Sequence, residues 1–469
     1  MSKKIRLIIV IACFALFFCT TPYIILYSLG YNINFKTGKI MATGGIYVRA
    51  NPSGTEVLVD SKINQKSSFF SNSIFIQDLT PKIHSVLVHK DGYIDYQKNI
   101  SVKEKEVAKL ENITLFKNNI SFNNIDNNVD YFLISPNYNS AFVVKTDNKI
   151  TNLKIINLIT PPITESTTVW PTKNVKILEA EWSNDMYKIL IKTTTGYFIF
   201  KTPGIDNGVI SPLPFLAESR EINFNPQNSN ELFFIKNKNL LSYSFPAETK
   251  AIEVPTKIIL KNVLDYTISD NRIIWYSLNG IIYSTDISGI TPQGQEDAVA
   301  YGPFTDNFKN FNSSKNYKLI ATSKNIFFNY EDKLYFENSE TVSFSGYLNK
   351  VNDLKISPDD QNTFYINDSE IWLDHSNYSY EQLNNKTPGK ILLNKFYENI
   401  SQAFWLNNNY LIFKADNKIK ISEIDNRENI NIIDLPGDYP NANIYFNPQD
   451  KRVYVLTGNT LIASDRLLP

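Results

Sequence analysis

Hydrophobic and polar residues alternate with a period of two along most of this chain, in short runs separated by turn-forming residues. Leu354–Asp374 shows the pattern: a strand ends at Ile356, Ser357–Asp360 form a turn, and further strands follow around Thr363–Ile366 and Ile371–Leu373. Ser, Pro and Asp favour turns, whereas Phe, Tyr, Ile and Trp suit half-buried strands. One such unit cannot bury its own apolar face, so it must pack against others like it.

The unit recurs about every 40 to 50 residues through the second part of the chain, a period typical of β-propeller blades with four strands. Its turns are Ser135-Pro136-Asn137, Ser183-Asn184-Asp185, Asn225-Pro226-Gln227, Ser269-Asp270-Asn271, Ser313-Ser314-Lys315, Ser357-Pro358-Asp359, Asn407-Asn408-Asn409 and Asn447-Pro448-Gln449. We therefore predict about eight blades. Seven is the alternative, because the fifth and seventh copies are degenerate. A string of unrelated hairpins would leave many sheet edges open and would not explain the spacing.

A separate group of alternating strands precedes these repeats, over Gly44–Phe116. Val57 and Val59 alternate with more polar neighbours, and turn residues such as Asn51–Gly54 and Asp91-Gly92 divide the strands. About six short strands within about 70 residues predict a small β-sandwich.

An apolar run from Leu7 to about Leu29 follows a short basic start. A helix over this run is about 34 Å long, enough to cross a hydrocarbon core of about 30 Å. We predict a retained signal anchor with its N-terminus in the cytoplasm. The alternative is a cleaved signal peptide with Leu7–Phe18 as its apolar region, but no small-residue cleavage site follows it. Three residues fit an aromatic belt at the membrane interface: Tyr23, Tyr27 and Tyr31.

Composition narrows the classes of partner and chemistry. The 469 residues carry 47 basic and 47 acidic side chains, so no electrostatic argument favours nucleic acid as a partner. The two cysteines, Cys13 and Cys19, both lie in the apolar run, which excludes disulfides and Cys-ligated metals elsewhere.

The segment Gly44–Phe116 resembles a PEGA domain. The resemblance rests on Gly45–Val48, then Pro52–Asp60 with its Pro and Gly, then Leu79–Val88, and finally Asp91-Gly92-Tyr93. The chain departs from the family at Ser53, Thr55, Ser61 and Lys82. The resemblance implies a β-sandwich of surface or envelope proteins and carries no catalytic residues.

The repeats, over about Asp130–Pro469, resemble the blades of TolB-like and WD40-like (PD40) β-propellers. What carries the resemblance is the order of a hydrophobe, Ser-Pro-Asp, a strand and an aromatic strand.

The fold class that we expect is all-β apart from one N-terminal transmembrane helix, with a small PEGA-like β-sandwich followed by a β-propeller. The expected divisions are residues 1–30 (anchor), 31–43 (linker), 44–116 (sandwich), 117–130 (linker) and 131–469 (propeller). Only Arg466–Pro469 follow the last repeat, so the strand-like segment near Ile120–Phe122 is predicted to supply the missing outer strand of the last blade.

Candidate chemistry is sparse. His84 and His89 lie on one strand at an odd spacing, so they point to opposite faces and cannot chelate a metal together. No nucleophile elbow, P-loop or dinucleotide fingerprint occurs. Asp359-Asp360 and Asp434–Asp450 raise a calcium hypothesis, but turn formation explains such residues better. The five tryptophans could line a sugar-binding surface, but Trp182, Trp275 and Trp372 fall inside or beside repeat strands, where packing between blades explains them better.

We therefore expect a non-enzymatic binding or assembly scaffold, a single-pass membrane protein with its bulk outside the cytoplasm at the cell envelope. No catalytic, cofactor-binding or metal site is predicted. Its partners are the membrane, through the N-terminal helix, and an envelope protein or cell-wall polysaccharide, but not nucleic acid. Rigid loops with exposed tyrosines suit binding, which makes Tyr301, Tyr378 and Tyr380 the candidate residues. The alternative class is an extracytoplasmic hydrolase or lyase with its site in the propeller channel, since the fold alone does not decide.

Overall fold

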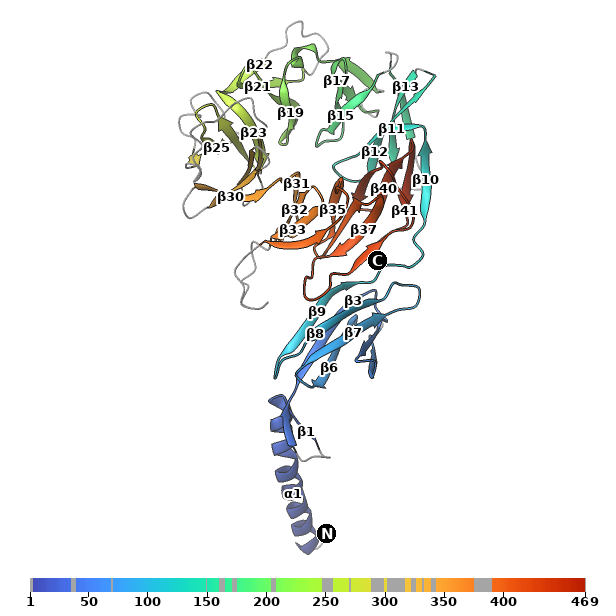
Figure 1. Ribbon diagram of the computed structural model, residues 1–469, viewed down its shortest axis with the longest axis vertical. Coiled ribbons are helices and arrows are strands. Elements are labelled where there is room, and N and C mark those ends of the chain that lie inside the picture. Colours follow the sequence, from blue (N-terminus) through green and yellow to red (C-terminus); the bar gives the residue numbers. More distant parts are fainter. Residues whose placement is uncertain are drawn as a thin grey trace.

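A computed structural model of the chain describes residues 3–34, 39–68, 71–148, 150–159, 165–170, 175–203, 208–246, 256–269, 271–287, 299–301, 317–321, 326–330, 333–338, 343–374 and 390–468. Three parts follow one another along its long axis: a helix, a small sandwich and a ring of four-stranded sheets (Figure 1). This order places the sandwich between the helix and the ring.

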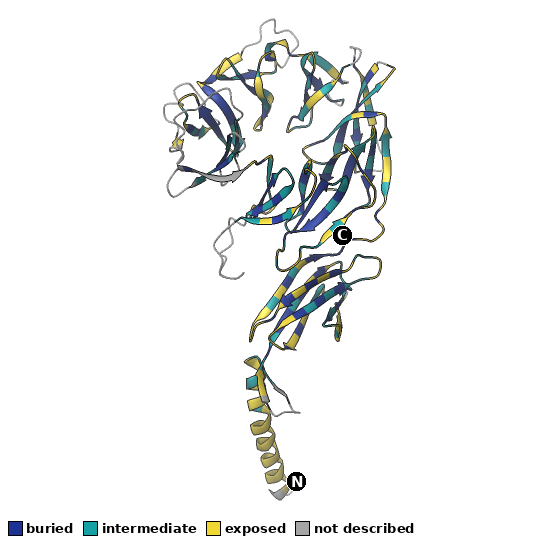
Figure 2. Ribbon diagram, in the orientation of Figure 1, coloured by how far each residue is buried: buried dark blue, intermediate teal, exposed yellow. Residues whose placement is uncertain are grey.

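Helix α1 (Lys3–Ser28) extends from one end of the sandwich, and its described side chains are almost all exposed (Figure 2). Its stretch Ile5–Ser28 is long and apolar enough to cross a membrane. The segment after it, expected to be a polar linker, instead forms a hairpin of β1 (Tyr31–Asn34) and β2 (Lys39–Ala42). Pairing satisfies backbone groups that an isolated extended segment would leave to water.

The sandwich has two sheets with the strand orders β6-β3-β9 and β5-β4-β7-β8. Its strands are β3 (Gly44–Asn51), β4 (Glu56–Val59), β5 (Ile63–Lys66), β6 (Ser73–Leu79), β7 (Ile83–His89), β8 (Tyr96–Ser101) and β9 (Val107–Thr114). Strands β3 and β9 run parallel, whereas the other neighbouring strands run antiparallel. Strands β8 and β9 are therefore edge strands, one in each sheet.

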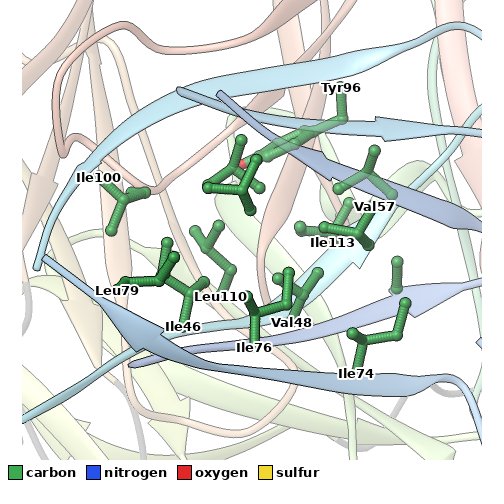
Figure 3. Close-up of a cluster of buried hydrophobic side chains, with 14 of the residues drawn as sticks. Ile46, Val48, Val57, Ile74, Ile76, Leu79, Tyr96, Ile100, Leu110 and Ile113 are labelled. Atoms are coloured by element: carbon green, nitrogen blue, oxygen red, sulfur yellow. The ribbon is translucent and has the colours of Figure 1, made fainter. Parts of the chain in front are cut away.

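Alternate residues of these strands point into one shared core, as their period of two predicts. Ile46 and Val48 of β3 face Val57 of β4 across it (Figure 3). Strand β3 passes so close to the turn before β9 that a Cβ on Gly44 would overlap the Lys103 carbonyl oxygen. Glycine at that position is therefore required by the close approach of two backbones.

Beyond the sandwich, eight four-stranded antiparallel sheets lie in the described part of the chain. The first three comprise β11 (Val129–Ile134), β12 (Ser140–Asp147), β13 (Ile150–Asn157) and β14 (Glu165–Val169); β15 (Ile177–Trp182), β16 (Lys188–Thr193), β17 (Gly196–Lys201) and β18 (Val209–Pro212); and β19 (Arg220–Asn225), β20 (Asn228–Lys236), β21 (Asn239–Ser244) and β22 (Thr256–Lys261). A short 3-10 helix, η1 (Pro214–Leu216), joins β18 to β19. We call residues 122–464 the propeller domain.

The remaining sheets continue the same order. They comprise β23 (Val263–Ser269), β24 (Arg272–Ser277), β25 (Ile282–Asp286) and β26 (Val299–Tyr301); β27 (Tyr317–Ala321), β28 (Ile326–Tyr330), β29 (Lys333–Asn338) and β30 (Ser343–Asn349); and β31 (Asp353–Ile356), β32 (Thr363–Asn367), β33 (Glu370–Asp374) and β34 (Ile391–Lys395). The last two hold β35 (Gln402–Asn407), β36 (Tyr410–Ala415), β37 (Lys418–Glu423) and β38 (Ile432–Asp434); and β39 (Asn443–Asn447), β40 (Arg452–Thr457) and β41 (Thr460–Ser464) with β10 (Phe122–Asn127).

Hydrophobic clusters join each sheet to the next one around the ring. Phe142 of the first sheet packs with Ile189 of the second, for example, and Phe364 of the sheet β31–β34 packs with Phe413 of the sheet after it. One further cluster joins Val143 of the first sheet to Leu461 of the last. Apolar burial between neighbours therefore supplies the stability that one sheet lacks alone.

In several of the repeated turns, the Ser or Asn at the end of the first strand is buried, as at Ser135, Ser183, Ser357 and Asn447. The Ser183 hydroxyl donates to Asp185 Oδ1 (2.6 Å) and accepts from the Lys188 N–H (2.9 Å). Ser357 makes the same pair of bonds with Asp359 and Asn362. Where asparagine replaces serine, as at Asn447, its Oδ1 accepts an N–H two residues on, here from Gln449. A buried polar side chain is thus satisfied by the hairpin that it closes.

Strand β10 occupies the outer position of the last sheet, beside β41, although it precedes the first sheet in sequence. The chain therefore begins the propeller domain by pairing with its own end. Asp126 of β10 also forms an ion pair with Lys145 of β12 (2.7 Å), and the Ser121 N–H donates to Asp465 (2.9 Å). These contacts fasten the two ends of the domain to one another.

We expect removal of β10 to lower the melting temperature. A chain that starts at Asp130 exposes the outer edge of β41 and loses the pairing, so it should unfold at a clearly lower temperature than one that starts at Leu115. A third chain, starting at Ser121, keeps β10 but loses the packing of Phe116 and Ile120 against the last two sheets. Equal melting temperatures for the starts at Ser121 and Asp130 would show that β10 contributes nothing.

Candidate functional site

The tyrosines predicted to bind a partner have no described side-chain geometry. Tyr301 is the last residue of β26, where its backbone is in register with Ile282 of β25. Tyr378 and Tyr380 lie outside the described residues, as does His375. The three tyrosines therefore stay a prediction.

The two described histidines have local partners. His84 is buried, with Nδ1 2.9 Å from Asp60 Oδ2 and Nε2 2.7 Å from the Thr80 carbonyl oxygen. His89 lies on the exposed face, 2.6 Å from Asp95. Each histidine thus pins a turn of the sandwich rather than facing a common site.

All five tryptophans are described, and they pack within or beside the cores between sheets. Trp275 is fully buried and stacks on Tyr283, and Trp182 donates to the Leu133 carbonyl of the preceding sheet (3.4 Å). Trp405 donates in the same way to the carbonyl of Lys355 (3.0 Å). The described geometry therefore assigns the tryptophans to packing between sheets.

The first strands of successive sheets contact one another, among them β11 with β15, β23 with β27, and β31 with β35. Side chains reinforce these contacts by binding the backbone of the next first strand. The Ala180 N–H donates to the Tyr131 hydroxyl (3.1 Å), and the Ile444 N–H donates to Gln402 (2.6 Å). A belt of such bonds lies along the inner strands, where a catalytic channel would have to be.

Three carboxylates stand on consecutive inner strands of this belt: Glu181 of β15, Glu221 of β19 and Asp265 of β23. Burial raises the pKa of Glu181 to about 7. Burial, together with the negative charge of Glu221, raises the pKa of Asp265 to about 7 as well. Groups that titrate near neutrality can act as general acids or bases, so this cluster is the strongest candidate for chemistry in the described structure.

The half-buried Glu181 and the buried Asp265 nonetheless both bind backbone amides. Glu181 accepts from the Phe224 N–H (3.3 Å), and Asp265 accepts from the N–H groups of Leu319 (2.6 Å) and Tyr266 (2.9 Å). Both thereby link their own sheet to the next one. Among the described residues, no group of three or more His, Cys, Asp or Glu side chains could hold a metal ion. The hydrogen bonds of Glu181 and Asp265 therefore join neighbouring sheets.

A second polar cluster joins the sandwich to the propeller domain. Lys98 of β8 has a fully buried side chain, and its Nζ donates to Glu423 Oε1 (2.7 Å) and to the Asp425 carbonyl (2.7 Å). Glu423 also accepts from the Tyr96 hydroxyl (3.1 Å) and from the backbone and side-chain amides of Asn431 (both 2.9 Å). Both domains thus supply hydrogen bonds to this buried pair, which is what a buried ion pair needs.

The loop between β37 and β38 extends this junction to the other sheet of the sandwich. Arg427 binds Asp425 through Nε and Nη2, and its Nη1 donates to the Lys109 carbonyl of β9 (2.9 Å). Burial opposes ionisation of Asp425, but the Arg427 hydrogen bonds prevail and lower its pKa. The loop therefore covers the open side between the edge strands β8 and β9.

The sequence pattern points to Lys98 of this junction but not to its partner Glu423. Lys98 occupies an inward position between Tyr96 and Ile100, and a charged residue there marks an edge that another element must cover. The partner, Glu423, is more than 300 residues away, and no local pattern points to it. Glu181 and Asp265 also gave no signal, because their burial depends on the neighbouring sheet.

Comparison with known families identifies the sandwich. Residues 43–118 match the family model of the PEGA domain. The predicted resemblance is thereby confirmed, and the PEGA-like domain is the unit that carries Lys98. A search of curated proteins found no match to the chain.

Solved structures similar to the chain are β-propellers, including WD40 domains. They include Sqt1 of Saccharomyces cerevisiae (9% identity, 74% of this chain and 98% of that chain, TM-score 0.47) and the WD40 domain of SCAP from fission yeast (10%, 74% and 98%, 0.45). The Cps50 (Swd1) β-propeller domain of Myceliophteria thermophila is a third (12%, 74% and 99%, 0.42). With identities this low and TM-scores below 0.5, the architecture rests on the sheets and cores described above.

We expect Asp265→Asn to remove part of the pH dependence of stability. The folded-state pKa is about 7 and the ordinary value is 3.8, so the folded state holds this proton longer than the unfolded state. Stability that is present below about pH 4 is therefore lost as the pH rises to about 7. The variant keeps an acceptor oxygen without a charge, so its melting temperature relative to the wild type should rise by several degrees between pH 5 and pH 8.

Thermal unfolding across this pH range measures the effect. Asp438→Asn is the matched control, because that carboxylate is exposed and should change the profile little. An unaltered difference between Asp265→Asn and the wild type from pH 5 to pH 8 would show that Asp265 is ionised throughout.

We expect Lys98→Met to loosen the junction by about 3–5 kcal/mol, because it leaves the Glu423 carboxylate buried without its counter-charge. Trypsin cleavage after Lys117, between the two domains, should accelerate accordingly. Adding Glu423→Gln should restore much of the resistance, since the pair is then neutral. Lys66→Met, which breaks an exposed pair with Glu56, is the control. Equal cleavage rates in Lys98→Met and Lys66→Met would contradict a role for the pair.

Proposed function

We propose that the chain is a non-enzymatic, single-pass membrane scaffold whose bulk lies outside the cytoplasm, at the cell envelope. Helix α1 is its anchor, the PEGA-like domain is the stalk, and a closed eight-bladed propeller is the head. The head binds a protein partner through its loops. The propeller is of the TolB-like (PD40) kind in this proposal.

The observation that carries the proposal is the buried junction between stalk and head. A fully buried lysine paired with a nearly buried glutamate, with bonds from both domains, holds the head at a fixed orientation on the stalk. A rigid arm between an exposed apolar helix and a set of loops suits the display of a binding surface at a set distance from a membrane.

The polar groups at the inner strands support binding over catalysis. Glu181 and Asp265 are occupied by backbone amides, so their described role is to brace the ring. The described tryptophans are packed between sheets, which favours a protein partner over a polysaccharide that would stack on exposed aromatic rings. Rigid loops on a braced ring are the usual places where such folds bind proteins.

We expect the triple variant Tyr301→Ala, Tyr378→Ala and Tyr380→Ala to lose most of its partner. Crosslinking in intact cells, recovery through a tag after Pro469 and mass spectrometry measure this loss, because tyrosines contribute much contact area at little entropic cost. The melting temperature should change little. Tyr187→Ala with Tyr397→Ala is the control, since both of those side chains are exposed.

Several results would contradict this function. Unchanged recovery with the triple variant would exclude these loops, and recovery of polysaccharide instead of protein would change the class of partner. Turnover of peptide, glycan or ester substrates by the purified protein, abolished by Glu221→Gln, would identify an enzyme.

A further inference from the structure

One end of the PEGA-like domain lies directly against the end of α1. We define the rim as the described residues 40–45, 77–83 and 102–107. The Thr43 N–H donates to the Gly30 carbonyl (2.8 Å), and the Lys105 N–H donates to the Thr43 carbonyl (2.8 Å). Near the end of the helix, the Tyr27 hydroxyl donates to Gln77 Oε1 (2.6 Å). Tyr27 in the last turn of α1 and Gly30 just after it therefore bind two segments of the rim, and the third segment lies beside Gly30, where an added Cβ would be 3.3 Å from Lys105 Cγ.

The length of α1 sets how far the rim lies from the acyl chains of a bilayer. At about 1.5 Å per residue, the twenty residues from Leu7 to Leu26 span about 30 Å, the thickness of a typical hydrocarbon core. Tyr27, which binds the rim, is then the next residue outside the core. The headgroup layer on each side is about 5–7 Å deep. Because the rim is hydrogen-bonded to Tyr27 and Gly30, it must lie within that headgroup layer.

The rim and its hairpin carry exposed apolar side chains of a size unusual for a solvated surface. Ile83 is 66% exposed, Ile40 54%, Val107 44% and Met41 41%. Ile83 and Val107 begin β7 and β9, in different sheets, so the apolar residues come from both sides of the sandwich. Isolated exposed hydrophobes need no explanation, but several at one end of a domain mark a contact surface.

Charges on the rim are balanced rather than basic. Lys82 pairs with Asp60 (3.2 Å), Lys103 pairs with Glu106 (3.7 Å), and the Lys105 ammonium lies over the Tyr31 ring (4.4 Å to its centroid). A surface of this kind has no electrostatic reason to prefer anionic lipids. Any attraction to a bilayer must come from its apolar side chains and from aromatic residues at the interface.

We infer that the rim of the PEGA-like domain is a lipid-contacting surface. It sits in the headgroup layer of the bilayer that α1 crosses, with Ile40, Met41, Ile83 and Val107 reaching the acyl boundary. The inference rests on the proposed function in requiring α1 to be a membrane anchor. The partner of the rim is the surface of a bilayer that carries no net charge. The contact holds the stalk upright on the membrane.

Spin labels on the full chain in phosphatidylcholine vesicles test this. In a background with Cys13→Ala and Cys19→Ala, single labels are introduced by Ile83→Cys and Val107→Cys. Lys66→Cys is the matched control, on an exposed strand end of the same sandwich away from the rim. Leu16→Cys, at the middle of α1, reports the anchor itself. Power saturation by oxygen and by a water-soluble nickel chelate gives the depth of each label.

Labels at 83 and 107 should be severalfold less accessible to the nickel chelate than the label at 66, and more accessible to oxygen. This shielding should not change when phosphatidylglycerol is added. If the label at 16 lies deep in the bilayer while the labels at 83 and 107 are as accessible to nickel as the label at 66, then α1 is an anchor but the rim does not contact lipid. If the label at 16 is also accessible to nickel, α1 does not cross the bilayer and the rim does not contact lipid. Shielding that needs anionic lipid would overturn the apolar contact inferred here.

Discussion

The pair between Lys98 and Glu423 is the interaction on which the arrangement of the whole molecule depends. Two opposite charges lie out of water at the meeting of two domains, and such a pair is tolerable only when both partners are present and fully hydrogen-bonded. Tyr96 and Asn431 complete that requirement, one from each side. The domains cannot separate slightly: partial opening would leave a charge buried without its partner. The junction is therefore either formed or broken, which distinguishes it from a flexible linker.

How far each part of the fold could be predicted from sequence depends on how distant its interacting residues are along the chain. The hairpins around Ser183, Ser357 and Asn447 were predictable, because one buried polar residue binds its own turn and the required letters lie within a few positions. The PEGA-like domain was predictable for a similar reason, since its alternating residues and turns are local. A structural feature whose interacting residues lie close together in the sequence can therefore be recognised from the sequence.

Features that depend on distant partners left little trace. Residues 31–43 were expected to be a linker, but Tyr31–Asn34 and Lys39–Ala42 within them pair as two strands. These strands are short and have no strong alternation of polar and apolar residues. Asp265 looks like any strand residue in the sequence. Its burial in the folded chain raises its pKa to about 7, and the Leu319 N–H of the next sheet donates a hydrogen bond to it. Lys98 has a local signal, a charge at an inward position of its strand, whereas the loop that covers it has none. The candidate site was accordingly predicted less well than the fold.

The pairing of β10 with β41 has a consequence for how the protein is made. The two strands are separated by more than 330 residues, and the ribosome delivers β10 first. At about 5–20 residues per second, β10 waits about 20–70 s for its partner to be synthesised. During that interval it is an unpaired edge, open to pairing with another chain. A polypeptide that stops short of Thr460 never acquires the partner, so the exposed strand distinguishes an incomplete chain from a finished one, and quality-control factors that recognise open edges have a means of removing it.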